Sequence, residues 1–208
     1  MYREIKIKKM RKLILEVQMS IDGFIAEVNG NTDWMLWNWG PDWKWDYELR
    51  KYHTDLTKSV DCIFLSRQMA EEGFIAHWAI ASENPEDPRF EFAKHITDTH
   101  KIVFTKTLDK SASIPGGWDK TDIAEEDFVD AINKLKKKNG KDIIVYGGAT
   151  FVSSLIRARL IDEFHLLINP VAIGGGLSIF NNLTSRQNMT LVKSKAFDCG
   201  MILLHYKL

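Results

Sequence analysis

One segment in the second half of the 208-residue chain places a strand, a glycine turn and a helix in immediate succession. The segment runs from Asp142 to Ile156 and reads DIIVYGGATFVSSLI. Its apolar start is typical of a buried strand, and the apolar residues after the Gly147-Gly148 pair recur at helical spacing. This order of elements favours an α/β fold.

The same glycine pair predicts a binding site for an anion. A strand that turns into a helix through Gly147-Gly148 leaves backbone N–H groups free at the helix start, where the helix dipole favours negative charge. A phosphate or pyrophosphate is the expected ligand. The alternative is a tight turn that binds nothing, and the segment by itself leaves both possibilities open.

Composition limits the classes of partner. The chain is 45% hydrophobic, with 28 basic and 28 acidic residues. One compact domain over residues 13–208 is expected, after an N-terminal extension of residues 1–12. The balanced charge predicts neither a nucleic-acid partner nor a membrane partner. Cys62 and Cys199 lie in apolar stretches, as free thiols do in a reduced compartment, and no signal peptide or membrane-spanning run is evident. A cytoplasmic protein is therefore expected.

The hydrophobic pattern alternates between strands and helices along the chain. Strands are predicted at 13–20, 60–65, 101–105, 142–145, 164–168, 191–197 and 201–206. Helices are predicted over 46–58, 67–79, 89–96, from 128 to the stop signal at 139–140, and after the glycine pair. The predicted fold is a three-layer α/β/α sandwich with a mostly parallel central sheet and an antiparallel C-terminal hairpin.

Two further strand ends carry groups suited to phosphate. Arg67 and Gln68 follow the strand at 60–65, and Thr105 and Lys106 follow the next strand. Carboxyl ends of parallel strands share one edge of a sheet, so these residues and Gly147-Gly148 should line a common crevice. Three such sites suit a pyrophosphate and a further phosphate, as in NADP. The alternative is that strand ends in α/β proteins are polar for geometric reasons alone.

A loop with five tryptophans precedes the first predicted helix. It contains Trp34, Trp37, Trp39, Trp43 and Trp45. So many rings are expected to pack over the first strand, to wall an apolar pocket beside it, or to be buried at a dimer contact.

Several well-known catalytic motifs are absent from the sequence. It has no G-x-x-x-x-G-K-[ST], no G-x-G-x-x-G after the first strand, no G-x-S-x-G and no H-E-x-x-H. The histidines are scattered singly, so no metal site is predicted, and no nucleophile stands beside a base. If the chain is an enzyme, the chemistry is expected to belong to a bound cofactor, and no catalytic side chain is assigned.

Two stretches together resemble a known family. Residues 20–26, read with Gly30 and Trp34, and the second half from Asp142 through 170–176, are similar to the reductase domain of bifunctional riboflavin-biosynthesis proteins. That family shares the dihydrofolate reductase fold, and the similarity spans residues 13–208. The resemblance implies an NADPH-dependent reductase of a small heterocycle, a ribosylaminopyrimidine or a pterin-like compound, often as a homodimer.

The resemblance also implies roles for individual residues. In the family, one segment holds the cofactor pyrophosphate, and it corresponds here to Gly147, Gly148, Ala149, Thr150 and Phe151. The positions that contact the phosphates after the second strand correspond to Arg67 and Gln68. The strand end near the phosphate of the adenosine ribose corresponds to Thr105 and Lys106. The nicotinamide side is matched by Gln18 and Trp34, and the substrate side by Asp22, Thr32 and Tyr146.

The chain also departs from the family pattern. Tyr146 stands where riboflavin-pathway reductases have an acidic residue before the glycine turn, Met69 replaces a threonine, and the deaminase half is missing. The carboxylates Asp42, Asp46 and Glu48 compete for the position of the acid that protonates folate in dihydrofolate reductases. These departures motivate an alternative, an NADP-binding sensor or degenerate homologue without turnover.

Overall fold

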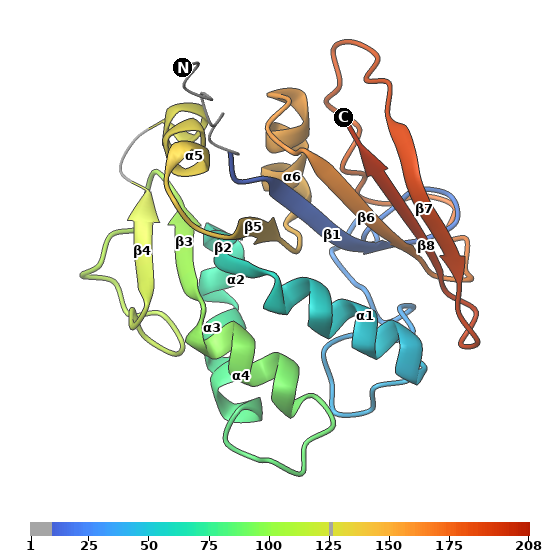
Figure 1. Ribbon diagram of the computed structural model, residues 1–208, viewed down its shortest axis with the longest axis horizontal. Coiled ribbons are helices and arrows are strands. Elements are labelled where there is room, and N and C mark those ends of the chain that lie inside the picture. The colour runs from blue at the N-terminus through green and yellow to red at the C-terminus, as the bar shows by residue number, and fades with distance from the viewer. Residues whose placement is uncertain (1–9, 125–126) are drawn as a thin grey trace, which may run out of the picture.

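The computed structural model describes residues 10–124 and 127–208, and its strands form a single eight-stranded sheet with helices on both faces (Figure 1). The strands are β1 (Leu13–Met19), β2 (Val60–Ser66), β3 (His100–Phe104), β4 (Thr121–Ala124), β5 (Asp142–Val145), β6 (Glu163–Ile168), β7 (Thr190–Ala196) and β8 (Ile202–Lys207). The helices are α1 (Tyr47–Lys58), α2 (Arg67–Glu71), α3 (Phe74–Ala81), α4 (Phe90–Asp98), α5 (Phe128–Lys137) and α6 (Ala149–Arg157).

The strand order is β4-β3-β2-β5-β1-β6-β8-β7. The pairs from β4 to β6 are parallel, whereas β8 pairs antiparallel with both β6 and β7. This arrangement confirms the predicted α/β class, with a mostly parallel sheet and an antiparallel C-terminal hairpin. Three adjacent strands, β2, β5 and β1, end at the same edge, which is where the predicted site lies.

Alternation along β1 explains the two helical layers. Leu13, Leu15 and Val17 belong to the core that packs against α5 and α6. Ile14 belongs to the opposite core, which includes residues of α1, α3 and α4. Figure 1 shows these two helix groups on opposite sides of the sheet. Because side chains alternate along a strand, Glu16 points to the same side as Ile14, into an otherwise apolar layer.

Two elements differ from the predictions. The strand β4 was not predicted, because its four residues include an exposed Asp122 and show no clear alternation. The helix predicted over 67–79 is instead two helices, α2 and α3. They are separated at Gly73, which has a left-handed φ of 94° that L side chains rarely adopt.

The N-terminal end of the described chain is tied into the sheet. Residues 1–9 of the predicted extension lie outside the described residues. Arg11 is 8% exposed and donates from its backbone N–H to Lys136 O at 2.9 Å. Lys12 Nζ lies 2.5 Å from Glu163 Oε1. The domain therefore includes Arg11 and Lys12, which the sequence assigned to the extension.

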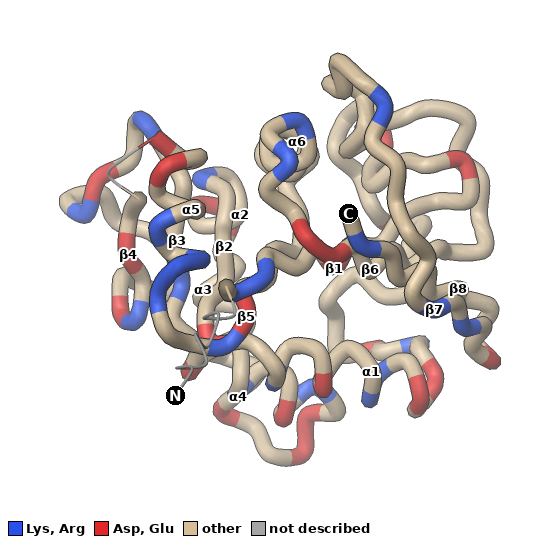
Figure 2. Tube along the Cα trace, turned by 45° about the horizontal axis from the view of Figure 1, so that its top comes forward, with Lys and Arg blue, Asp and Glu red and all other residues tan. Residues whose placement is uncertain are grey.

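Charges are interspersed over the fold. Figure 2 shows Lys and Arg positions mixed with Asp and Glu positions along the trace. Among the described residues, no helix is both long enough and apolar enough to cross a membrane.

One cation is buried in the sheet. Lys101 on β3 is 1% exposed, and its ammonium donates to the carbonyl oxygens of Thr97 at 3.1 Å and Thr99 at 2.8 Å. Burial lowers the pKa of Lys101 to about 8, since the charged form loses its hydration.

This lowered pKa predicts a gain of stability in alkali. Below pH 8, Lys101 is protonated in the folded and the unfolded chain alike. Between about pH 8 and the unfolded pKa of 10.5, only the unfolded chain keeps the proton, so the free energy of unfolding rises with pH. Urea titrations should show the stability of wild type, relative to Lys101→Met, rising by about 3.5 kcal/mol across this window, at about 1.4 kcal/mol per pKa unit. A pH-independent difference between the two proteins would contradict the prediction.

Candidate cofactor and substrate site

A large crevice opens at the carboxyl ends of β1, β2 and β5. Its volume is about 690 Å³, and we call it the outer crevice. Gln18 and Thr32 line one part of it, Arg67 and Gln68 another, and the turn from Tyr146 to Phe151 a third. The structure thus brings together ten of the fourteen residues predicted for the site.

The two glycines of the turn are needed for different reasons. Gly148 is the N-cap of α6, with φ 85° and ψ 91°, and a Cβ placed there would lie 3.0 Å from Ser66 Oγ. Gly147 has no left-handed φ, and a Cβ there would meet no atom within 4 Å. Because no side chain of the described residues caps α6, the N–H groups of its first turn stay open toward the crevice. This cradle fits a pyrophosphate.

The guanidinium of Arg67 stands at the rim of the crevice. Arg67 is the first residue of α2, directly after the helix-capping Ser66, whose Oγ accepts from Met69 N at 3.2 Å. Arg67 Nη1 donates to Thr107 Oγ1 at 3.5 Å, and its Nε lies 3.6 Å from Glu71 Oε2. Both contacts are long and solvent-exposed and therefore weak, so a ligand phosphate can compete for the guanidinium.

The structure leaves four predicted residues outside the lining of the crevice. Trp34 and Lys106 do not line it. Thr105 Oγ1 instead accepts from Thr107 N at 3.1 Å and Leu108 N at 3.0 Å, which closes the turn after β3. The fourth residue is Asp22.

The carboxylate of Asp22 is used inside the protein. Its Oδ2 accepts from Ile173 N at 3.1 Å and from Gly174 N at 2.7 Å, and its Oδ1 accepts from the Ser20 hydroxyl at 2.6 Å. The Ser20 hydrogen bond, with those two backbone bonds, lowers the pKa of Asp22. In this structure Asp22 fixes the loop that contains Ile173 and Gly174.

Gln18 holds the tryptophan loop onto the sheet. Its Nε2 donates to Trp37 O at 2.8 Å, and its Oε1 accepts from Asn169 Nδ2 at 3.3 Å. Asn169, which is fully buried, also accepts from Leu36 N at 2.9 Å. Gln18 lies at the predicted place, but both ends of its amide are already engaged.

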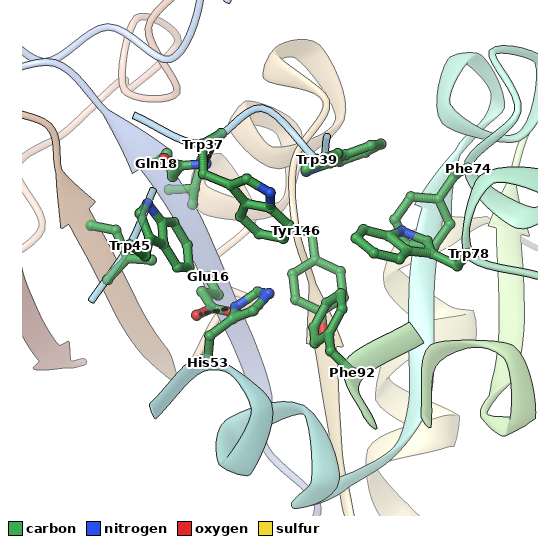
Figure 3. A pocket seen from close by; sticks show the side chains of 12 residues that line it. Glu16, Gln18, Trp37, Trp39, Trp45, His53, Phe74, Trp78, Phe92 and Tyr146 are labelled. Atoms are coloured by element: carbon green, nitrogen blue, oxygen red, sulfur yellow. Dashed lines mark hydrogen bonds and ion pairs between the residues drawn. The ribbon is translucent and has the colours of Figure 1, made fainter. Parts of the chain in front are cut away.

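Behind the outer crevice lies a smaller cavity walled by aromatic rings, which we call the inner chamber (Figure 3). Its volume is about 40 Å³, and Val17, Gln18, Trp39 and Tyr146 line both cavities. The other aromatic and histidine side chains of its wall are Trp37, Trp45, His53, Phe74, Trp78 and Phe92. Of the fates expected for the tryptophans, packing over the first strand and walling a pocket both occur.

Trp39 stands at the junction of the two cavities in a strained conformation. Its φ is 62°, in the left-handed region that non-glycine residues seldom occupy. The carbonyl oxygen of Trp39 accepts from His77 Nε2 at 3.1 Å and from the guanidinium of Arg89. Strain of this kind persists when neighbouring groups impose it, and it concentrates at functional sites.

The floor of the inner chamber is a buried polar pair that the sequence analysis missed. Glu16 on β1 is 2% exposed, and its Oε1 lies 2.9 Å from Nδ1 of His53 on α1, which is 5% exposed. Figure 3 shows the two side chains facing each other beneath the tryptophans. Among the described residues, neither Glu16 Oε2 nor His53 Nε2 has a hydrogen-bond partner. The available signal was a carboxylate in the middle of an apolar strand, where Glu is rarely buried unless paired.

Tyr146 separates the two cavities. Its hydroxyl lies 2.6 Å from Thr57 Oγ1. Burial, with a contribution from the nearby charge of Glu16, raises the pKa of Tyr146 well above its ordinary value. Tyr146 therefore stays protonated and neutral across the physiological range.

The three acids that the sequence offered as candidates lie elsewhere. Asp46 is the N-cap of α1, where its Oδ1 accepts from Leu49 N at 2.9 Å. Glu48 pairs with Lys195 at 3.1 Å, and Asp42 lies 3.5 Å from Lys44. None of the three lines either cavity.

The strand order and the glycine turn at the sheet edge define the dihydrofolate-reductase-like class of α/β proteins. The chain belongs to the RibD C-terminal domain family, whose model matches residues 11–203. This is a family of NADPH-dependent reductases.

Relatives extend over nearly the whole chain. The uncharacterized protein YyaP of Bacillus subtilis is 30% identical over 201 residues, covering 95% of each chain, and the uncharacterized protein YwjB is 26% identical over 204 residues, covering 94% of this chain and 97% of YwjB. A putative riboflavin biosynthesis protein from Shewanella sp. PV-4 has a similar fold, with a TM-score of 0.66 and 21% identity over 95% of this chain and 98% of the other. The deaminase/5-amino-6-(5-phosphoribosylamino)uracil reductase of Thermotoga maritima gives a TM-score of 0.64 and 16% identity, covering 96% of this chain and 57% of that one.

Proposed function

We propose that this protein is an NADPH-dependent reductase of a small planar heterocycle, of the ribosylaminopyrimidine or pterin-like kind. The observation that carries the proposal is the convergence of the open α6 start, the bare Gly147 and the Arg67 guanidinium on one 690 Å³ crevice. A cavity of this size suits a bound organic ligand, and its anion-binding groups suit a dinucleotide.

Each part of the crevice has a distinct role in this proposal. The N–H groups at the start of α6 would bind the pyrophosphate, with Arg67 and Gln68 beside them. Lys106 is exposed just beyond the end of β3, the strand next to β2, and would reach a phosphate on the adenosine ribose. NADPH, when bound, supplies the hydride.

The aromatic residues at the junction orient the substrate and exclude water. Trp39 and Tyr146 line both cavities, so a planar ring between them would touch the crevice on one side and the inner chamber on the other. Gln18 keeps the tryptophan loop closed over this point through its bond to Trp37 O. Excluding water strengthens electrostatic interactions inside the site.

Thermal unfolding tests cofactor binding directly. A ligand that binds only the folded state at 100 times its Kd stabilises it by about 2.7 kcal/mol, or about 5–10 °C for a chain of this size. NADPH should give such a shift at a much lower concentration than NADH. The absence of a shift at millimolar NADPH would remove the proposal.

A second candidate is an NADP-binding protein without turnover. It is favoured by the engagement of Gln18 and Asp22 in bonds within the protein, together with Tyr146 in place of the family's acid. Oxidation of NADPH against a panel of pterins, aminopyrimidine ribosides and quinones separates the two candidates. Turnover of any member excludes the sensor, and binding without turnover across the panel favours it.

The homodimer implied by the resemblance is tested by light scattering.

A further inference from the structure

The inner chamber contains a carboxylate whose hydrogen-bonding capacity is half used. Oε1 of Glu16 lies 2.9 Å from Nδ1 of His53, whereas Oε2 is buried without a hydrogen-bond partner among the described residues. Leaving a buried polar atom unpaired costs about 1–3 kcal/mol, and more when it is charged. Such an atom points to a ligand that brings the missing hydrogen-bond donor.

The walls of the chamber select the shape of that ligand. The ring of His53 stacks on Phe92 at a centroid distance of 4.2 Å and meets Trp45 edge-on at 5.3 Å. Trp37 meets His53 edge-on at 5.5 Å. Flat aromatic faces around a carboxylate favour a planar group, and they attract a positively charged one.

The charge of the chamber excludes phosphate. No Lys or Arg is among the described residues that line it. The guanidinium groups of Arg50 and Arg89 contact Trp43 and Trp78, each 5.9 Å from a ring centroid, and do not line the cavity. Burying an anionic ligand beside Glu16 without a cation would be strongly unfavourable.

We propose that the inner chamber binds the nitrogen-bearing edge of a planar heterocycle through N–H donors that reach Glu16 Oε2. The ligand class is an amino-substituted or protonated nitrogen heterocycle, with no anionic group at this end. A cavity of about 40 Å³ admits the edge of a ring, and the rest of the ring extends past Trp39 and Tyr146 into the outer crevice. Identifying this ligand as the reductase substrate rests on the proposed function, but the recognition by Glu16 does not.

A second glutamate on the same face of the sheet supplies the matched control. Glu163 lies 3.3 Å from His205 Nε2 and 3.6 Å from His165 Nε2, outside both cavities. The two imidazole rings stack at a centroid distance of 4.0 Å with 27° between their planes. Lys12 pairs with the other oxygen of Glu163.

The test is a binding titration without cofactor, followed by quenching of tryptophan fluorescence. The probes are 2-aminopyridine, which carries the donor edge, its near-isostere 2-methylpyridine, which lacks the amino group, and the anion pyridine-2-carboxylate. Wild type should bind 2-aminopyridine at least about tenfold more tightly than 2-methylpyridine, as expected for hydrogen bonds to a charged group, and should not bind the anion. Glu16→Gln should abolish the preference, and Glu163→Gln should retain it.

The same variants separate recognition from a purely structural role. If Glu16 only holds His53 in place, Glu16→Gln should lower the melting temperature; if it is kept for a ligand, removing the buried charge should leave that temperature unchanged or raise it. Equal binding of the two uncharged probes by wild type, or a preference that survives in Glu16→Gln, would overturn the proposal. The comparison of probes on wild type decides the matter even if the variant does not fold.

NADPH titration of the same proteins keeps the two proposals apart. Glu16→Gln should bind NADPH as wild type does, because Glu16 lies outside the outer crevice. A wild type that prefers 2-aminopyridine but ignores NADPH would refute the reductase proposal and leave the recognition by Glu16 standing. A wild type that binds NADPH but shows no preference among the probes would refute the recognition by Glu16 and leave the reductase proposal standing.

Discussion

Replacing Gly147 by valine should reduce NADPH affinity about 100-fold or more while leaving the fold intact. That loss corresponds to about 2.7 kcal/mol of binding free energy. A Cβ at Gly147 would meet no atom of the described residues within 4 Å, so the valine side chain would project into the space that a pyrophosphate needs. Isothermal titration with NADPH measures the effect, and the melting temperature without ligand should stay close to that of wild type.

Gly175→Val is the control for the Gly147 variant. Gly175 also has open space around its Cβ position and no left-handed φ, but it lies outside the lining of both cavities. Its valine variant should bind NADPH normally. Undiminished binding by Gly147→Val would move the pyrophosphate away from this turn.

The neighbouring glycine would give a different result. Gly148 has φ 85°, and a Cβ there would lie 3.0 Å from Ser66 Oγ and 3.3 Å from Ser66 Cβ. A valine at this position is strained whatever binds beside it, so it should destabilise the protein as well as the complex. The sequence does not specify the backbone angles of the two adjacent glycines, and these angles make Gly147 the better position at which to test pyrophosphate binding.

The elements that the sequence predicted are those whose local pattern agrees with the tertiary structure. β1, β2, β5 and β6 are apolar runs in the middle of the mostly parallel sheet, and α1, α5 and α6 have one apolar face. β4 is different, because its hydrogen bonds to β3 place it at the sheet edge without a hydrophobic pattern of its own. Local periodicity does not record such a pairing.

The candidate site was predictable where the backbone creates it. The glycine turn and the arginine after β2 follow from the geometry of parallel strands, and both line the crevice. Gln18 and Asp22 show the opposite case, because a residue type does not reveal whether its hydrogen bonds are already made within the protein. Glu16 and His53 lie 37 positions apart, so only the packing of α1 over β1 brings them together.

The second prediction with a large effect concerns the positive charge of Arg67 at the rim of the outer crevice. Arg67→Ala should weaken NADPH binding about 10- to 100-fold, since hydrogen bonds to a charged group contribute about 1.5–3 kcal/mol. The partners of the guanidinium among the described residues, Thr107 and Glu71, are weak and exposed, so its removal should leave the free energy of unfolding nearly unchanged. Arg157→Ala, at the exposed far end of α6, makes the same change in net charge and should bind NADPH as wild type does.

Comparing two cofactors shows which phosphate Arg67 holds. NADH has the pyrophosphate of NADPH but lacks the phosphate on the adenosine ribose. If Arg67 binds the pyrophosphate beside the α6 start, Arg67→Ala should weaken both cofactors by the same factor. Lys106→Ala, one strand further out, should then weaken NADPH alone and lower its preference over NADH. If Arg67→Ala lost affinity for NADPH alone, Arg67 would hold the phosphate on the adenosine ribose and Lys106 the pyrophosphate. If it kept its affinity for both cofactors, Arg67 would lie outside the site.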